Sequence, residues 1–268
     1  MKRNSLIAAG ALCSLLALGA CGNASKSGAD EGQEKDMSVE FTTYKYSQIA
    51  EVVGADSLEI PGWKYSAVTG EGVLPEKVGK SDITALRDSL ERLADVTFTS
   101  GKSVEARVDT TMYRMTNLPD STEACGSAFN QLSVIRMNPR IIVWKDYAGG
   151  SICMSAHGTY STTYVNYDVA ANKILSVADL MKPGYEEKLA GILRDQLKSQ
   201  GTQLLVPLNE VNIPKNFTIT DDGIMFMWAL YEIAPYAAGE ISVEVPGYQL
   251  QDILNSEAYS LIYGQPLE

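Results

Sequence analysis

Short segments with alternating side chains recur along this chain and restrict it to folds that are built on β-sheets. Tyr160, Thr162 and Tyr164 share one face of such a segment, which runs to Val169. Patterns of this kind predict further strands at residues 39–46, 63–70, 104–113, 132–137, 140–147, 217–220, 224–231 and 241–245.

Two amphipathic helices interrupt these strands. Ser81 is expected to cap a helix from about Asp82 to Ala94, and Pro183 to open a second helix over residues 184–199. Their apolar stripes consist of Ile83, Leu86, Leu90 and Leu93 in the first helix and of Leu189, Ile192, Leu193 and Leu197 in the second. A short helix is predicted at residues 250–254. Strands interrupted by helices predict an α+β fold of two small domains, whose mixed or antiparallel sheets are each packed by a helix.

Glycine and proline predict where the strands end. Asn138-Pro139 is typical of a turn between two strands, and Gly149-Gly150 predicts a break in the strand pattern. Gly223 can supply the positive φ of a tight hairpin. The preceding Asp221-Asp222 pair lacks the alternating ligands of a calcium loop, which favours a turn over a cation site.

The beginning of the chain has the pattern of an exported protein. Lys2 and Arg3 precede an apolar run from Leu6 to Leu18, which is shorter than the roughly 20 apolar residues of a transmembrane helix. The segment Leu18-Gly19-Ala20-Cys21 resembles the lipobox of bacterial lipoprotein signal peptides. This resemblance implies cleavage before Cys21, attachment of fatty acyl chains such as palmitate there, and a protein tethered to an envelope membrane, either periplasmic or surface-exposed.

The chain is therefore expected to have five parts. They are a signal peptide (1–20), a flexible tether (21–38), an N-terminal α+β domain (39–158), a C-terminal α+β domain (159–255) and a tail (256–268). Cys125 and Cys153 are the two cysteines of the folded part. An oxidising compartment would allow a disulfide between them, and two buried free thiols are the alternative.

Charge and histidine content narrow the classes of function. The net charge of −11 disfavours binding to nucleic acid, whereas it would attract basic proteins or serve solubility alone. His157 is the single histidine, which excludes two-histidine zinc sites, and the segment around Ser151 lacks the closing glycine of a nucleophile elbow. No catalytic residue, metal or cofactor is predicted, and His157 is interpreted first as part of a loop.

Three segments, at residues 149–168, 175–199 and 217–245, together resemble the extracellular domains of the RsiV family. These proteins are anti-sigma factors that sense lysozyme, and their first domain also occurs beside a PdaC-type peptidoglycan deacetylase. In the third segment Pro235 should end or edge a strand, Gly239 should adopt a conformation closed to other residues, and the Tyr236 hydroxyl should bond to backbone. A lipoprotein signal replaces the spanning helix of an anti-sigma factor, so no sigma-factor partner is implied.

The expected function is ligand binding without catalysis. Half-exposed aromatic side chains on sheets can grip proteins or sugars, although ordinary packing is the alternative for each of them. The candidate ligand-binding residues are Tyr160, Tyr164, Trp144, Tyr147, His157, Tyr231, Glu232 and Tyr236. A basic, lysozyme-like protein or a peptidoglycan-related glycan is the expected ligand. A cell-wall hydrolase with paired carboxylates and a structural envelope lipoprotein are the alternatives.

Overall fold

The computed structural model describes residues 38–52, 64–99, 103–106, 113–114 and 122–263. The predicted signal peptide, the Cys21 lipid site and the tether up to residue 37 lie outside the described residues. So do residue 63 and residues 107–112, which belong to two of the predicted strands. No described helix is long and apolar enough to cross a membrane.

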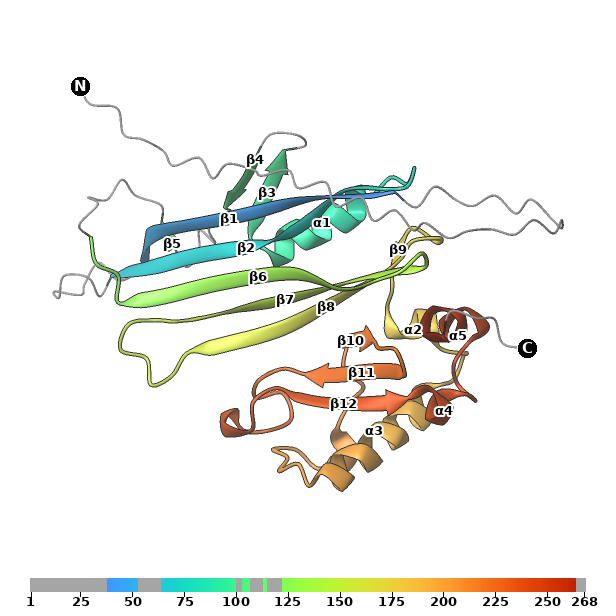
Figure 1. The fold of residues 1–268 in the computed structure, drawn as a ribbon. Helices are drawn as coiled ribbons and strands as arrows, with labels where there is room; N and C mark the ends of the chain where they lie inside the picture. Colours follow the sequence, from blue (N-terminus) through green and yellow to red (C-terminus); the bar gives the residue numbers. More distant parts are fainter. Residues whose placement is uncertain (1–37, 53–63, 100–102, 107–112, 115–121, 264–268) are drawn as a thin grey trace.

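A seven-stranded mixed sheet is the largest element of the fold (Figure 1). Its strand order is β5-β1-β2-β6-β7-β8-β9, in which β2 and β6 run parallel and all other neighbours run antiparallel. The strands are β1 (Val39–Val52), β2 (Tyr65–Val78), β5 (Tyr113–Arg114), β6 (Gly126–Met137), β7 (Ile141–Ser151), β8 (Thr159–Asp168) and β9 (Lys173–Ile174). A separate hairpin consists of β3 (Val96–Thr99) and β4 (Ser103–Ala106).

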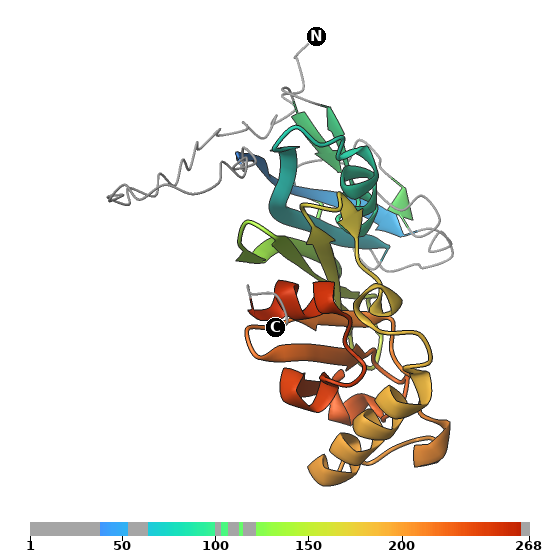
Figure 2. The ribbon, with the colours of Figure 1, turned by 90° about the vertical axis from the view of Figure 1, so that its right-hand side faces the viewer.

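A second, three-stranded antiparallel sheet and most of the helices follow the large sheet in sequence. The strands are β10 (Asn216–Ile219), β11 (Gly223–Trp228) and β12 (Ile241–Pro246), and the helices are α2 (Val177–Leu180), α3 (Glu186–Gln200), α4 (Gly247–Leu250) and α5 (Ser256–Tyr263), with short 3-10 turns η2 (Leu208–Glu210) and η3 (Tyr236–Ala238). Figure 2 shows this C-terminal part on one side of the large sheet, with α1 (Thr84–Leu93) on the other side. The α+β class with mixed and antiparallel sheets is thus confirmed.

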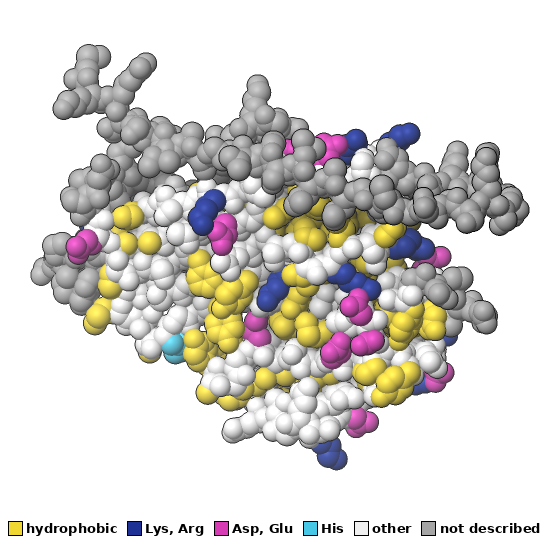
Figure 3. Space-filling view, in the orientation of Figure 1, with side chains coloured by type: hydrophobic (Ala, Val, Ile, Leu, Met, Phe, Trp, Pro, Cys, Tyr) yellow, Lys and Arg dark blue, Asp and Glu magenta, His cyan; other side chains and the backbone are white. Residues whose placement is uncertain are grey.

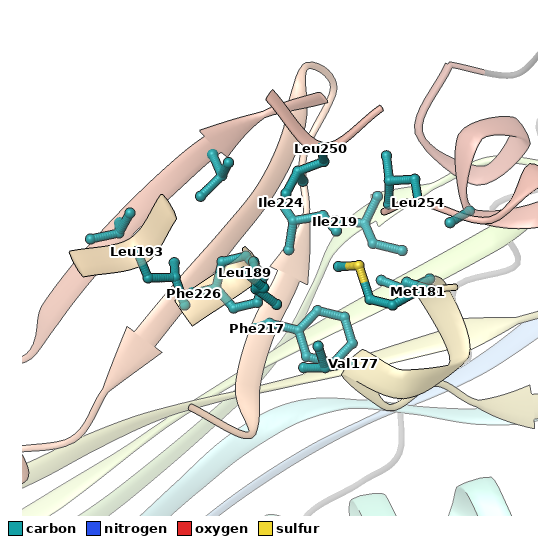
Figure 4. Close-up of a cluster of buried hydrophobic side chains, with 14 of the residues drawn as sticks. Val177, Met181, Leu189, Leu193, Phe217, Ile219, Ile224, Phe226, Leu250 and Leu254 are labelled. Atoms are coloured by element: carbon teal, nitrogen blue, oxygen red, sulfur yellow. The ribbon is translucent and has the colours of Figure 1, made fainter. Parts of the chain in front are cut away.

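Alternate residues of β7 belong to two different hydrophobic cores. Ile142 and Trp144 are buried with the apolar stripe of α1, whereas Ile141 and Val143 are buried with the C-terminal part. Figure 4 shows the second of these cores, in which side chains from α2, α3, α4, β10 and β11 converge. The large sheet is therefore the middle layer, and its two faces carry different cores.

Arg136 on β6 joins the large sheet to the C-terminal part. Its guanidinium donates hydrogen bonds to the carbonyls of Ile219 (3.3 Å), Thr220 (2.7 Å) and Ile262 (3.3 Å).

Strand β8 pairs with β7 along its whole length, although the predicted domain boundary at residues 158/159 would assign the two strands to different domains. That boundary stays a prediction.

The expected cap of the first helix is wrong, because α1 begins at Thr84 with Ile83 in the N-cap position, and Ile83 makes no side-chain cap hydrogen bond. The Asp82 carboxylate, not the Ser81 hydroxyl, accepts the backbone N–H of Thr84 (3.0 Å) and also its hydroxyl (2.7 Å). These bonds to Thr84 lower the pKa of Asp82. Ser81 and Asp82 are both of residue types that favour the N-cap position, so the sequence did not show that the helix begins only after them.

Two of the predicted glycine roles are also wrong. Gly149 and Gly150 do not break the strand but lie inside β7 and pair with both neighbours. A Cβ at Gly150 would come within 2.2 Å of the Ser127 carbonyl oxygen, so the glycine permits close approach of β6. Gly223 likewise has no positive φ, and a Cβ there would meet the Val245 carbonyl at 2.1 Å. These glycines are therefore required by close packing between neighbouring strands and not by turns.

Two other expectations have clear outcomes. The turn at Asn138-Pro139 is confirmed, because the Asn138 side chain accepts the backbone N–H groups of Arg140 (2.8 Å) and Ile141 (2.9 Å). The segment expected as a tail instead begins with α5, and its Leu261 is buried in the C-terminal core.

Candidate ligand-binding surface

The loop between β7 and β8 is a turn held by a disulfide. The Ser155 N–H donates to the Ile152 carbonyl (3.0 Å), which places Cys153 and Met154 at the centre of the turn. Cys153 is bonded to Cys125, just before β6, with the two Cα atoms 5.2 Å apart. The disulfide therefore fixes this loop to the neighbouring strand.

The loop between β11 and β12 begins with a second tight turn. The Glu232 N–H donates to the Ala229 carbonyl (3.1 Å), and the Glu232 carboxylate accepts the Ala229 N–H in return (2.8 Å). This closed arrangement presents Tyr231, whose side chain is 54% exposed. Further along, Gly239 has φ +74, as the sequence predicts.

The two loops meet at three aromatic side chains, which we call the aromatic corner: His157, Tyr231 and Tyr236. The rings of His157 and Tyr236 stack with centroids 3.9 Å apart and an interplanar angle of 24°. The Tyr236 hydroxyl donates to the Gly158 carbonyl (2.8 Å), which confirms the predicted bond to backbone. The corner thus ties together segments that are far apart in sequence.

Hydrogen bonds fix the orientation of the imidazole in the aromatic corner. His157 Nδ1 lies 2.9 Å from the Gly158 carbonyl oxygen, which can only accept, so Nδ1 carries the hydrogen. In the neutral ring Nε2 is then an acceptor, and the Tyr231 hydroxyl lies 3.3 Å from it. His157 and Tyr231 are exposed and Tyr236 is half-buried, so the first two form the exposed part of the corner.

Backbone strain is concentrated at the two exposed loops. Four described non-glycine residues have positive φ, and Asp95 and Asn172 are of types that tolerate it. The other two are bulky: Met154 (φ +66, 74% exposed) and Tyr231 (φ +64, 54% exposed). Such strain costs about 1–3 kcal/mol and is found preferentially at binding sites. Met154 and Tyr231 are exposed, so burial of their side chains does not offset the cost of this strain. The strain therefore favours a functional role for the two loops.

Replacing Tyr231 provides a test of this strain. Tyr231→Gly should be more stable than Tyr231→Ala by about 1 kcal/mol, because only glycine adopts the left-handed conformation without a Cβ penalty. Urea unfolding of the two variants measures the difference. Equal or reversed stabilities would mean that Tyr231 is not strained.

A second group of rings lies on the face of the large sheet that is turned toward the C-terminal part. We call Phe129, Tyr147 and Tyr160 the aromatic row; they lie on β6, β7 and β8, and all three are half-buried. The Tyr160 hydroxyl lies 3.1 Å from the position that a Cβ at Gly239 would occupy, so the row reaches the β11–β12 loop. In Figure 3 a column of hydrophobic side chains runs down this face to the histidine.

Trp144 is not a surface residue and is a correction to the candidate set. Its side chain is 0% exposed, and its indole N–H donates to the Val73 carbonyl (3.2 Å) in the core beside α1. Trp144 and Tyr147 are three residues apart on one strand, so they lie on opposite faces. Strand alternation was the available signal for this distinction.

Tyr164 and Glu232 have supporting positions. The Tyr164 ring packs against the C-terminal core, and burial, with the charge of Glu240, raises the pKa of its hydroxyl. The Glu232 carboxylate holds the turn described above.

Phe129 and Met154 were not among the residues that the sequence predicts for this surface. Phe129 would have been found had the strand expected from residue 132 been extended backward, whereas no pattern marks Met154.

Asp146 bears on the hydrolase alternative. Burial raises its pKa to about 7, although a hydrogen bond from the Asn130 amide (2.7 Å) opposes the shift. Its side chain is 3% exposed, on the face that carries the core beside α1. The charge of a second carboxylate, Asp95, also raises this pKa, but Asp146 is buried and accepts its hydrogen bond from an amide. This raised pKa therefore does not identify an acid–base pair in a cleft.

Comparisons with known proteins agree with this fold. Residues 178–248 match the family model described as "Protein of unknown function (DUF3298)". The crystal structure of a DUF3298 family member from Bacteroides fragilis NCTC 9343 has a TM-score of 0.56 and 17% identity, and covers 85% of this chain and 98% of its own. A DUF3298 family protein from Pseudomonas aeruginosa PAO1 has a TM-score of 0.52 and 17% identity, with coverage of 84% and 97%. No curated protein matches the chain.

The family match includes only part of the candidate surface. Residues 178–248 contain the β11–β12 loop with Tyr231 and Tyr236, whereas His157 and the aromatic row precede the match. At 17% identity the two solved structures show a shared fold, and this shared fold includes both the large sheet and the C-terminal part.

Proposed function

We propose that this protein is a lipid-anchored protein of the bacterial cell envelope that binds a protein or glycan ligand without catalysis. The observation that carries the proposal is the aromatic corner, in which the exposed and strained Tyr231 contacts His157. A fold gains little by holding a tyrosine in this conformation at its surface, whereas a ligand gains a rigid aromatic anchor.

The nature of the ligand follows from charge and from family resemblance. A net charge of −11 attracts basic partners and speeds their encounter at low salt. The resemblance of residues 230–240 to the RsiV family adds a lysozyme-like protein as a candidate, with peptidoglycan fragments as the glycan candidate. The DUF3298 match leaves this finer assignment as a proposal.

Calorimetric titration with lysozymes and with peptidoglycan fragments tests the proposal. We expect binding by the natural protein and at least tenfold weaker binding by Tyr231→Gly, the variant that keeps the backbone turn. Tyr248→Ala is the matched control, because Tyr248 is 67% exposed and lies on α4, away from the corner. Absence of binding to every ligand would reject the proposal, as would equal affinities of the Tyr231 and Tyr248 variants.

The anchoring part of the proposal depends on Cys21. Cys21→Ser should release the protein from the membrane fraction, because acyl chains contribute about 0.8 kcal/mol per buried methylene and cannot be attached to serine by the lipoprotein route. Fractionation of cells followed by immunoblotting measures the shift. A Cys21→Ser product that sediments with membranes as the natural protein does would contradict lipid anchoring.

A further inference from the structure

The aromatic row owes its form to a glycine in the middle strand. Gly149 pairs with Phe129 on one side and with Tyr160 on the other. A Cβ at Gly149 would lie 2.9 Å from the tip of the Phe129 ring and 3.0 Å from the Tyr160 Cβ. The missing side chain therefore lets Phe129 lean over β7 and brings three rings from three strands together.

The rings of the aromatic row are neighbours but do not cover one another. The centroids of Phe129 and Tyr147 are 5.2 Å apart with an interplanar angle of 49°, and those of Tyr147 and Tyr160 are 6.1 Å apart at 57°. In a parallel stack each ring would bury the face of the next. The rings are tilted and each residue is half-buried, so part of each remains exposed to a ligand that lies across the strands.

Hydrogen-bonding and charged side chains border the aromatic row. Lys145 Nζ lies 5.9 Å from the centre of the Tyr147 ring. On the side toward β2, the Gln131 amide donates to Glu71 (3.2 Å), which also pairs with Lys45 (2.9 Å). Figure 3 shows a basic and an acidic side chain together near the upper end of the hydrophobic column. Apolar ring faces and polar groups thus alternate over short distances.

We propose that the aromatic row binds a linear, uncharged oligosaccharide that lies across β6, β7 and β8, with sugar units resting on the rings. This inference rests on the proposed function and names its ligand class. A pyranose has an apolar face of C–H groups and a rim of hydroxyls, which matches ring faces bordered by amide, ammonium and carboxylate groups. Strand faces of small β-folds bind oligosaccharides in the same general manner.

Two observations favour this ligand over others. The centre of a protein–protein interface is depleted in charged residues, whereas Lys145 lies beside the Tyr147 ring. The ion pair of Glu71 with Lys45 is joined to the row through Gln131, which pairs with Tyr147 across the sheet. The local charges include an ion pair, and the whole chain carries −11, so polyanionic glycans are repelled. A neutral chain satisfies the polar groups without this repulsion.

Titration with defined hexasaccharides tests the inference. The probes are the β-1,4-linked hexamers of N-acetylglucosamine and of glucose, with a hexamer of galacturonic acid as the anionic contrast. We expect at least one neutral hexamer to bind the natural protein and the anionic hexamer to bind at least tenfold more weakly. Tyr147→Ala and Tyr160→Ala should each weaken binding of the neutral hexamer at least tenfold.

Matched variants separate ring contacts from folding. Tyr147→Phe keeps the ring and should bind more tightly than Tyr147→Ala, while Tyr248→Ala, on the exposed surface of α4, should bind as the natural protein does. Circular dichroism confirms that each variant is folded. Unchanged affinity in a folded Tyr147→Ala variant would overturn the inference.

The result also separates this inference from the function on which it rests. Binding of a basic lysozyme, weakened by Tyr231→Gly, together with no binding of any neutral hexamer, overturns the glycan inference and leaves the proposed function intact. No binding of any lysozyme, peptidoglycan fragment or neutral hexamer overturns both.

Discussion

Asp146→Asn is expected to remove a fall in stability that the natural protein undergoes between about pH 4 and pH 7. Burial raises the pKa of Asp146 to about 7 in the folded state, from a value of 3.8 in an ordinary environment. Below pH 4 both states hold the proton. Between the two pKa values the unfolded chain releases it while the folded protein keeps it, so stability falls as pH rises, at about 1.4 kcal/mol per pH unit.

The accumulated difference is on the order of 4 kcal/mol above pH 7, where both states are ionised. An asparagine oxygen can still accept the hydrogen bond from Asn130, so the variant should lose the pH dependence without losing this contact. Urea unfolding of both proteins at several pH values from 4 to 8 measures the effect, and groups that do not interact with Asp146 cancel in the difference. Parallel stability curves would show that Asp146 ionises normally in the folded protein.

Removal of the disulfide is expected to have an effect of similar size. The bond between Cys125 and Cys153 closes a loop with a sequence separation of 28, for which the chain-entropy model gives about 3.5 kcal/mol. The double variant Cys125→Ser/Cys153→Ser should be destabilised by about this amount. It should also exchange amide hydrogens faster at residues 152–158, because the turn loses its attachment to the start of β6.

A reductant provides the matched control for the disulfide. Unfolding of the natural protein in urea with a reducing agent should approach the stability of the double serine variant, and the variant itself should not respond to the reductant. If the natural protein and the variant unfold at the same urea concentration without reductant, the disulfide does not contribute to stability.

The strands were predictable because their side chains alternate over several residues. The last strand, with Val243 and Val245 buried, and the helix stripe with Leu86 and Leu90 were both placed correctly. Gly149 shows where this reasoning failed. A pair of glycines predicts a turn when only the neighbours in sequence are considered. The role of Gly149 depends instead on β6 and β8, which pair with it across the sheet.

Most individual residues of the candidate surface could be predicted from the sequence, but the contacts between them could not. The Tyr236 hydroxyl was expected to bond to backbone, yet its acceptor, Gly158, lies 78 residues away and could not be named. The contact of His157 with Tyr231 likewise depends on the tertiary fold. Positive φ at Tyr231 and Met154 has no signature in these residue types, because neither is among those that favour it.

Amide hydrogen exchange with and without ligand tests most directly whether this surface is the binding site. With a lysozyme or a neutral hexasaccharide present, we expect slower exchange in the loops at residues 152–158 and 229–240 and along β7 and β8, and no change at α4 and α5. Protection at α4 and α5 alone, or no protection with either ligand, would contradict the account.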